Sequence, residues 1–185
     1  MKKFTEITST IIPLPIKDID TDMLIPAQRL TSISKDGYGE FLFERFRSED
    51  KNFPLNLPQY KGAKIIVADT NFGCGSSREH AVWALLDYGI EVIIAPSFSD
   101  IFFNNSMKNG LVLVTLDKSL TDSILSSANQ DNSKDNLVAN VNLSTKCVTI
   151  GDAKYAFNFD PFYQHCIMNG QDDLDYILHA ISAKG

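Results

Sequence analysis

The chain has 185 residues, enough to enclose one substantial hydrophobic core, and its 44% hydrophobic and 22% charged residues are typical of a globular domain. The formal net charge is -6, and the sequence contains no basic cluster. We therefore exclude nucleic acid and anionic membrane surfaces as expected partners, whereas an anionic substrate would need local positive groups.

The first part of the chain, residues 1–16, has no long apolar core. Thr5, Glu6, Thr8 and Thr10 interrupt it, so it does not resemble a signal peptide. Apolar runs elsewhere, such as residues 90–96, are too short to cross a bilayer. We expect a cytoplasmic protein.

Three acidic residues follow at alternate positions: Asp18, Asp20 and Asp22. In an extended chain they would point to one side and form either a polar site wall, which orients a cation or hydroxyls, or a solvated strand edge or turn before an apolar run. The spacing alone favours the second alternative. The next stretch, residues 28–57, mixes glycines, charges and aromatics, and we expect it to be a functional loop.

Strands and helices alternate in the middle of the chain. Short apolar strands are expected at residues 64–69, 91–95 and 111–116. A helix is expected from about Ser76 to Tyr88, where Gly89 ends it, and a second helix follows residues 96–99 and ends near residue 109. This order predicts an α/β fold with parallel strands joined by crossovers.

The last third of the chain has a different pattern. Residues 129–136 form a polar loop, and residues 146–150 and 154–159 are expected to form a hairpin around Gly151-Asp152. Residues 174–183 are expected to form an amphipathic helix. Because no linker and no internal repeat interrupts the chain, residues 1–185 are predicted to be a single domain.

The segment with the strongest chemical signal is residues 71–81, Asn-Phe-Gly-Cys-Gly-Ser-Ser-Arg-Glu-His-Ala, between a strand end and a helix start. Gly75 allows the backbone to approach a ligand closely, and the amides of a helix N-terminus favour an anion. Arg78 can hold a carboxylate with two hydrogen bonds, and Ser76 and Ser77 add two hydroxyls. The segment can bind a carboxylate or an alkoxide.

The same residues are equally compatible with a capping box, in which Ser76 caps the helix and Glu79 reaches back. Two serines, an arginine and flanking glycines within one turn favour a functional site. The pattern does not match a nucleophile elbow, because Arg78 stands where that motif needs glycine, and no Walker or dinucleotide motif is present.

The remaining reactive residue types give weaker signals. Cys74 is either a reactive thiol or a small packed side chain. The three cysteines are too widely spaced for a disulfide framework or a metal-ligand set, so we expect no metal held by this chain alone. A structural role is favoured for His80 and His165, and His179, on the expected terminal helix, is predicted to be solvated.

Residues 71–81 resemble the Asn-Phe-Gly-x-Gly-Ser-Ser-Arg-Glu-His-Ala signature of the aconitase swivelling domain. The chain is also similar to bacterial 3-isopropylmalate dehydratase small subunits in several collinear blocks, which together cover about residues 17–173. These blocks are residues 20–26, 96–105, 109–111 and 159–170.

The resemblance implies a single swivelling β/β/α domain of the aconitase C-terminal type rather than a plain doubly wound sheet. It also implies a heterodimer or heterotetramer with a large subunit that carries a four-iron–four-sulfur cluster, whose iron acts on the departing hydroxyl. The implied reaction is that of a hydro-lyase of leucine biosynthesis, which interconverts 2-isopropylmalate and 3-isopropylmalate through a dehydrated alkene.

By the same resemblance, Ser76 is the base that removes a carbon-bound proton, and Arg78 holds a substrate carboxylate. Ser77 and Gly75 lie at the same substrate-binding position, and Asp22 organises the catalytic site.

The chain departs from the family pattern at Arg29, where many relatives have phenylalanine, at the entrance to the substrate-recognition loop predicted at about residues 28–57. Arg29 is a candidate substrate-binding residue there. Two alternatives stay open: a dehydratase for a related diacid of the citramalate, homoaconitate or dimethylmalate type, and a non-catalytic anion-binding assembly module.

Overall fold

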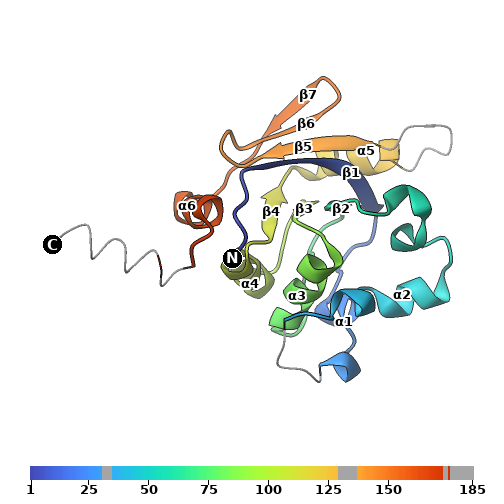
Figure 1. Cartoon of the computed structure of the whole chain (residues 1–185). Coiled ribbons are helices and arrows are strands. Elements are labelled where there is room, and N and C mark those ends of the chain that lie inside the picture. The colour runs from blue at the N-terminus through green and yellow to red at the C-terminus, as the bar shows by residue number, and fades with distance from the viewer. Residues whose placement is uncertain (31–34, 129–136, 173–174, 176–185) are drawn as a thin grey trace.

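In the computed structural model, which describes residues 1–30, 35–128, 137–172 and 175, one mixed sheet forms the centre of the molecule (Figure 1). Its seven strands lie in the order β4-β3-β2-β1-β5-β6-β7. The strands are β1 (Glu6–Leu14), β2 (Ile65–Ala68), β3 (Val92–Ala95), β4 (Val112–Thr115), β5 (Val138–Asn142), β6 (Cys147–Ile150) and β7 (Ala153–Ala156).

The predicted alternation of strands and helices is confirmed in the parallel half of the sheet. The helix α3 (Glu79–Tyr88) joins β2 to β3, and α4 (Asp100–Asn109) joins β3 to β4, with all three strands parallel. Figure 1 shows α3 and α4 on one side of these strands and α5 (Lys118–Ala128) on the other. The helices therefore cover both faces, which explains why these strands are almost entirely apolar.

The sequence analysis missed β1, although it is the strand that joins the two halves of the sheet. Its first half pairs antiparallel with β5, and its second half, Ile11 to Leu14, pairs parallel with β2. Burial changes accordingly, from mostly exposed or half-buried residues to four buried ones. The polar residues in the first half of β1 interrupt the apolar pattern by which a strand is recognised in the sequence. They are tolerated because only one face of the sheet is covered there.

The antiparallel half of the sheet confirms the predicted hairpin. β6 and β7 pair around Gly151-Asp152, and β7 ends at Ala156, earlier than expected. The helix α6 (Pro161–Asn169) follows, with Asp160 as its N-cap. The predicted polar loop at residues 129–136 lies outside the described residues, as does nearly all of the helix expected at 174–183.

The predicted functional loop at 28–57 contains several short helices in the parts that the structure describes, residues 28–30 and 35–57. Leu42 and Phe43 are fully buried, and Phe43, Phe46 and Phe53 pack against one another with ring centroids 5.4–6.2 Å apart. The short helices of this region and its flanks are α1 (Thr21–Leu24), η1 (Ala27–Arg29), η2 (Gly39–Phe41), α2 (Glu44–Glu49), η3 (Pro54–Asn56) and η4 (Pro58–Tyr60).

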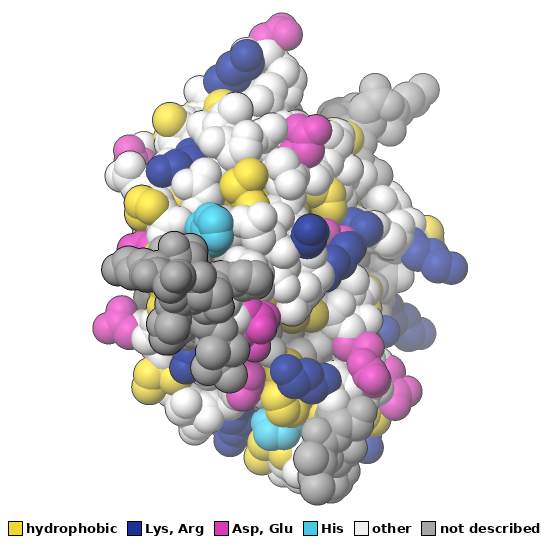
Figure 2. Space-filling model, turned by 60° about the vertical axis from the view of Figure 1, so that its left-hand side comes forward, with side chains coloured by type: hydrophobic (Ala, Val, Ile, Leu, Met, Phe, Trp, Pro, Cys, Tyr) yellow, Lys and Arg dark blue, Asp and Glu magenta, His cyan; other side chains and the backbone are white. Residues whose placement is uncertain are grey.

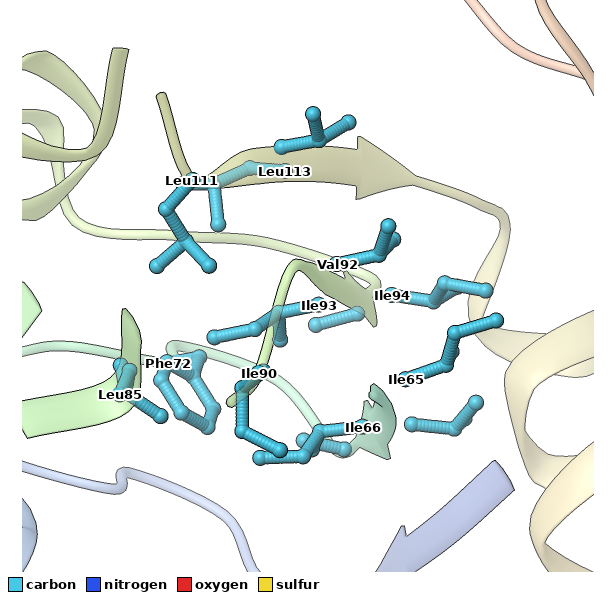
Figure 3. Close-up of a cluster of buried hydrophobic side chains, with 14 of the residues drawn as sticks. Ile65, Ile66, Phe72, Leu85, Ile90, Val92, Ile93, Ile94, Leu111 and Leu113 are labelled. Atoms are coloured by element: carbon cyan, nitrogen blue, oxygen red, sulfur yellow. The ribbon is translucent and has the colours of Figure 1, made fainter. Parts of the chain in front are cut away.

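The main core lies between the parallel strands and the helices that cover them (Figure 3). Each large apolar side chain that is fully buried there stabilises the fold by roughly 1.5–3 kcal/mol. The labelled core residues are Ile65, Ile66, Phe72, Leu85, Ile90, Val92, Ile93, Ile94, Leu111 and Leu113.

The surface is mixed in charge, at least on the face in Figure 2, where basic and acidic side chains are interspersed. That face therefore carries no large field of one sign. Within the described ranges, none of the helices combines the length and the apolar character that a membrane span requires.

The core contains one polar defect, the hydroxyl of Ser106 on α4. It is fully buried and has no hydrogen-bond partner among the described residues. We expect Ser106→Ala to raise the free energy of unfolding by about 1 kcal/mol, because a desolvated hydroxyl without a partner is a net cost. The measurement is urea denaturation followed by circular dichroism.

A matched control is available on the same helix. The Ser99 hydroxyl donates to the carbonyl of Gly73 at 2.6 Å and caps α4 at the amide of Phe102. We expect Ser99→Ala to lower the free energy of unfolding by about 1 kcal/mol. A destabilised Ser106→Ala variant would contradict the assignment of that hydroxyl as unpaired.

Candidate active site

Two segments far apart in sequence meet at the carboxyl ends of β1 and β2. The amide of Gly73 donates to the carbonyl of Ile19 at 2.7 Å, and the amide of Thr21 donates to the carbonyl of Cys74 at 3.0 Å. The Thr21 hydroxyl, 2% exposed, donates to the carbonyl of Ser76 at 3.0 Å. These bonds place the serine–arginine segment beside α1, in the position where open α/β sheets bind ligands.

The turn before the serines is shaped by close packing within the protein. Gly73 has φ +76°, and a Cβ there would lie 2.1 Å from Cγ of Phe102. Gly75 has φ +88°, and a Cβ there would lie 3.3 Å from Cβ of Asp20. Phe72 is buried, with its ring centroid 5.4 Å from that of Phe102. The glycines therefore allow Phe102 and Asp20 to approach the backbone closely, whereas Gly75 was predicted to allow the approach of a ligand.

We expect Gly73→Ala to lower the free energy of unfolding by about 2–4 kcal/mol, because an L-residue at this φ costs about 1–2 kcal/mol and the clash with Phe102 adds a similar amount. The measurement is urea denaturation. Gly62 is the matched control, because its φ is +78° and nothing lies within 4 Å of its Cβ position. Equal losses for Gly73→Ala and Gly62→Ala would contradict the predicted clash.

The capping-box alternative is wrong. The helix α3 begins at Glu79, three residues later than expected, and its N-cap is Arg78, which makes no side-chain cap. Glu79 does not reach back, since its Oε1 accepts from Nδ2 of Asn109 at 2.8 Å. The carbonyl of Ser76 accepts from the Thr21 hydroxyl, and Arg78, directly before the helix, has an extended backbone conformation.

The serines are consequently free for another role. Gly75, Ser76 and Ser77 are all exposed. Within the described part of the chain, the Ser76 hydroxyl is not engaged in a hydrogen bond. The helix α3 begins three residues after Ser76, and the amides and dipole at a helix N-terminus favour negative charge.

Arg78 and Asp22 form an ion pair across the two segments. The Arg78 side chain is 18% exposed and the Asp22 side chain 57% exposed, so the guanidinium is the more enclosed partner. A guanidinium has five donors, and one carboxylate uses at most two of them. Asp22 therefore fixes the position of Arg78 and leaves donors for a second carboxylate.

The expected row of three acids on one side of an extended chain is wrong. Asp20 caps α1 by accepting from the amide of Met23 at 2.7 Å, so the chain turns into a helix at Thr21. Asp18 accepts from Nδ2 of Asn71 at 2.6 Å. Only Asp22 reaches Arg78, because a helical turn rotates successive side chains by about 100°.

Arg29 forms a separate cluster. Its guanidinium pairs with Glu44 through two hydrogen bonds and lies 4.4 Å from the ring centroid of Phe41. The hydrogen bond to Glu44 raises the pKa of the Arg29 guanidinium. These contacts of Arg29 thus lie within the loop region, and its substrate contact stays a prediction.

The remaining candidate residues are Cys74 and the histidines. The His80 ring packs against Tyr38 and Trp83, with centroids 5.3 and 4.7 Å apart. Burial, followed by the charges of Asp20 and Asp18, raises the pKa of the Cys74 thiol, which favours the packed over the reactive alternative. His165 is exposed on α6, and His179 lies outside the described residues.

No group of three or more histidine, cysteine, aspartate or glutamate side chains in the described ranges is arranged to hold a metal ion.

Thr21 was not predicted from the sequence as a residue of the site, although its hydroxyl positions Ser76 from 55 residues away. No local signal identifies such a residue.

Comparison with known proteins shows the family to which the chain is similar. The aconitase C-terminal domain family matches residues 1–119. A protein of Francisella philomiragia called 3-isopropylmalate dehydratase small subunit is 48% identical, over 96% of this chain and 92% of its own length. One of the same description from Paramagnetospirillum magneticum is 46% identical, over 96% and 90%.

A solved structure supports the same fold. The crystal structure of 3-isopropylmalate dehydratase from Methanocaldococcus jannaschii matches with a TM-score of 0.67 and 28% identity, over 97% of this chain and 99% of that one. The predicted fold class, an α/β domain of the aconitase C-terminal type, is thereby confirmed.

Proposed function

The chain belongs to the family of 3-isopropylmalate dehydratase small subunits, which carry the aconitase C-terminal domain, and we propose that it contributes the proton-transferring serine and a carboxylate site to this hydro-lyase. The reaction interconverts 2-isopropylmalate and 3-isopropylmalate by dehydration and rehydration through 2-isopropylmaleate, in leucine biosynthesis. We place the enzyme in the cytoplasm. The observation that supports the proposal is that Ser76 is exposed and lies two residues before Arg78, which forms an ion pair with Asp22.

We assign Ser76 as the base. Its alkoxide takes a proton from one substrate carbon, hydroxide leaves the neighbouring carbon, and a double bond forms between them; hydration in the reverse sense completes the isomerisation. A serine hydroxyl is a poor base in water. The charge of Arg78, nearby backbone amides and the N-terminus of α3 stabilise its anion, and such preorganised dipoles are most effective where water is excluded.

The remaining residues bind the substrate. Arg78 holds a substrate carboxylate with the donors that Asp22 leaves free, and Asp22 keeps the guanidinium in place. The Ser77 hydroxyl and the backbone at Gly75 stabilise the charge that develops on the substrate. Because Arg29 is paired with Glu44, a substrate contact there requires a shared or exchanged ion pair.

The exposure of this site supports a partner that completes it. We propose that a large subunit covers the serine–arginine segment in a heterodimer or heterotetramer and carries a four-iron–four-sulfur cluster. The residues of this chain do not fit such a cluster. Cys74 lies in the turn before α3, Cys147 on β6 and Cys166 on α6, and no group of side chains among the described residues is arranged to hold a metal ion.

The test is anaerobic coexpression with the candidate large subunit, followed by an ultraviolet assay for 2-isopropylmaleate formed from 3-isopropylmalate. We expect activity only when both chains are present. Turnover by the isolated small chain would overturn the partner requirement.

The same complex is then given citramalate-type, homoaconitate-type and dimethylmalate-type diacids. Turnover of one of these without turnover of 3-isopropylmalate would keep the reaction and change the substrate. A cluster-loaded complex that turns over no diacid would favour the alternative of a non-catalytic anion-binding assembly module.

A further inference from the structure

The C-terminal end of α3 holds the chain that precedes η2. Asp87, in the last turn of α3, accepts from the amide of Gly37 at 3.0 Å and from the amide of Gly39 at 2.7 Å. Both bonds go to the same oxygen, Oδ2. Two amides two residues apart that converge on one anion form an anion-binding concavity, and here the anion is a side chain of the protein.

Helix electrostatics alone does not explain an acid at this position. The C-terminal end of a helix carries partial negative charge, so a carboxylate there is unfavourable, and the last turn of α3 contains no basic residue to offset it. The two amide donors supply the compensation. A carboxylate at the unfavourable end of the helix dipole indicates that Asp87 has a role in tertiary structure or function.

The segment at 37–39 is pressed directly onto the helix. A Cβ at Gly39 would lie 2.6 Å from the backbone nitrogen of Tyr88 and 2.7 Å from the backbone carbon of Asp87. Gly37 has φ +90°, a conformation that other residues rarely adopt. The close packing therefore fixes the positions of the Gly37 and Gly39 amides relative to Asp87.

A second contact, near the other end of α3, holds the same segment. Tyr38 is 2% exposed, and its ring packs edge-on against His80 at 5.3 Å and lies 6.3 Å from Trp83. His80 is seven residues before Asp87, about 10 Å along a helix. It is also two residues after Arg78. The helix that places Arg78 at the site thus also fixes the position of the segment at 37–39.

At its base the loop is closed by the Arg29–Glu44 ion pair, with Phe41 beneath the guanidinium. Because Phe41 belongs to η2, the Asp87 contact and the Arg29 contact act on one short piece of chain. A change at Asp87 therefore shifts the entrance at Arg29 as well.

We propose that Asp87 is a positioning residue, which sets the segment at 37–41, within the substrate-recognition loop predicted at about residues 28–57, relative to Arg78 and thereby determines how the substrate side chain is held. The inference rests on the proposed function. It predicts a binding defect without a chemical one, because Asp87 lies at the end of α3 opposite Ser76 and Arg78.

The test uses the coexpressed complex with Asp87→Ala and Asp87→Asn, with Glu49→Ala as matched control. Glu49 is an exposed carboxylate on α2 that pairs only with Arg45 among the described residues. We expect Asp87→Ala to raise KM for 3-isopropylmalate about fivefold with kcat changed less than about twofold, since two charge-assisted hydrogen bonds are lost at a partly exposed position. Asp87→Asn keeps a neutral acceptor and should recover about half of the loss on a logarithmic scale.

Two further readouts accompany the kinetics. The ratio of kcat/KM for 3-isopropylmalate to kcat/KM for citramalate, whose substituent is a methyl group, should fall in Asp87→Ala. In the full-length small chain alone, trypsin should cleave after the exposed Lys35 several times faster in Asp87→Ala than in the wild type or Glu49→Ala.

The outcomes separate the two proposals. A wild-type complex that turns over no diacid overturns the proposed function. An active wild-type complex whose KM, preference and Lys35 cleavage are unchanged in Asp87→Ala overturns only the role of Asp87. If Asp87→Ala does not fold, the same comparison with Asp87→Asn decides, and unchanged KM in that variant overturns the role.

Discussion

Replacing Ser76 by alanine is expected to lower kcat of the assembled enzyme by about 10³- to 10⁴-fold, the upper range for loss of a general base. The Michaelis constant should change little, because the ion pair of Arg78 and Asp22 remains and still binds the substrate carboxylate. The measurement is steady-state kinetics of alkene formation, with substrate affinity taken from calorimetry on the same complex.

Two variants control for this loss. Ser77→Ala removes the neighbouring exposed hydroxyl and should lower kcat by about tenfold, the size expected when one of several donors is lost. Ser126→Ala removes an exposed hydroxyl from α5, on the other side of the sheet, and should leave both constants unchanged. A Ser76→Ala complex with at least a tenth of the wild-type kcat would rule out Ser76 as the base.

Replacing Arg78 by alanine is the second large effect that we expect. Two charge-assisted hydrogen bonds to a substrate carboxylate are lost, so kcat/KM should fall by about 10²- to 10³-fold, mostly through KM. Asp22 is more than half exposed and tolerates the loss of its partner, so the fold should persist. Circular dichroism of the variant checks this point before kinetics are measured.

The geometry of the guanidinium can be tested separately from its charge. Arg78→Lys keeps the charge but loses the planar fork, and we expect an intermediate fall in kcat/KM, about tenfold. Arg45→Ala is the matched control, because Arg45 on α2 is exposed and pairs with Glu49. An unchanged KM in Arg78→Ala would contradict the assignment of this residue to the substrate carboxylate.

Much of the fold was accessible from the sequence, because the signals are local. The β-branched runs of β2, β3 and β4 and the glycines after α3 and α4 act within a few residues, so these elements were predicted close to their observed bounds. β1 was not, because its two halves pair with different strands and are buried differently.

The candidate site could be predicted only in part from the sequence. The pattern from Asn71 to Ala81 indicates both the family and the position of the candidate site, since the motif is continuous in sequence. The same pattern could not decide between a helix cap and a site. That choice depends on where the Glu79 side chain finds its partner, which is Asn109, thirty residues later.

By itself, the sequence determined that this is an α/β chain of the aconitase C-terminal type, and it identified Ser76 and Arg78 as the candidate site residues. Tertiary structure alone decided that α3 begins after Arg78, that Asp22 is the one acid of three to pair with it, and that Glu44 holds Arg29. The physical reason is the sequence separation over which each kind of interaction acts. Propensity and periodicity act over a few residues, whereas a buried hydroxyl such as that of Thr21 finds its acceptor across 55 positions only once the strands have paired.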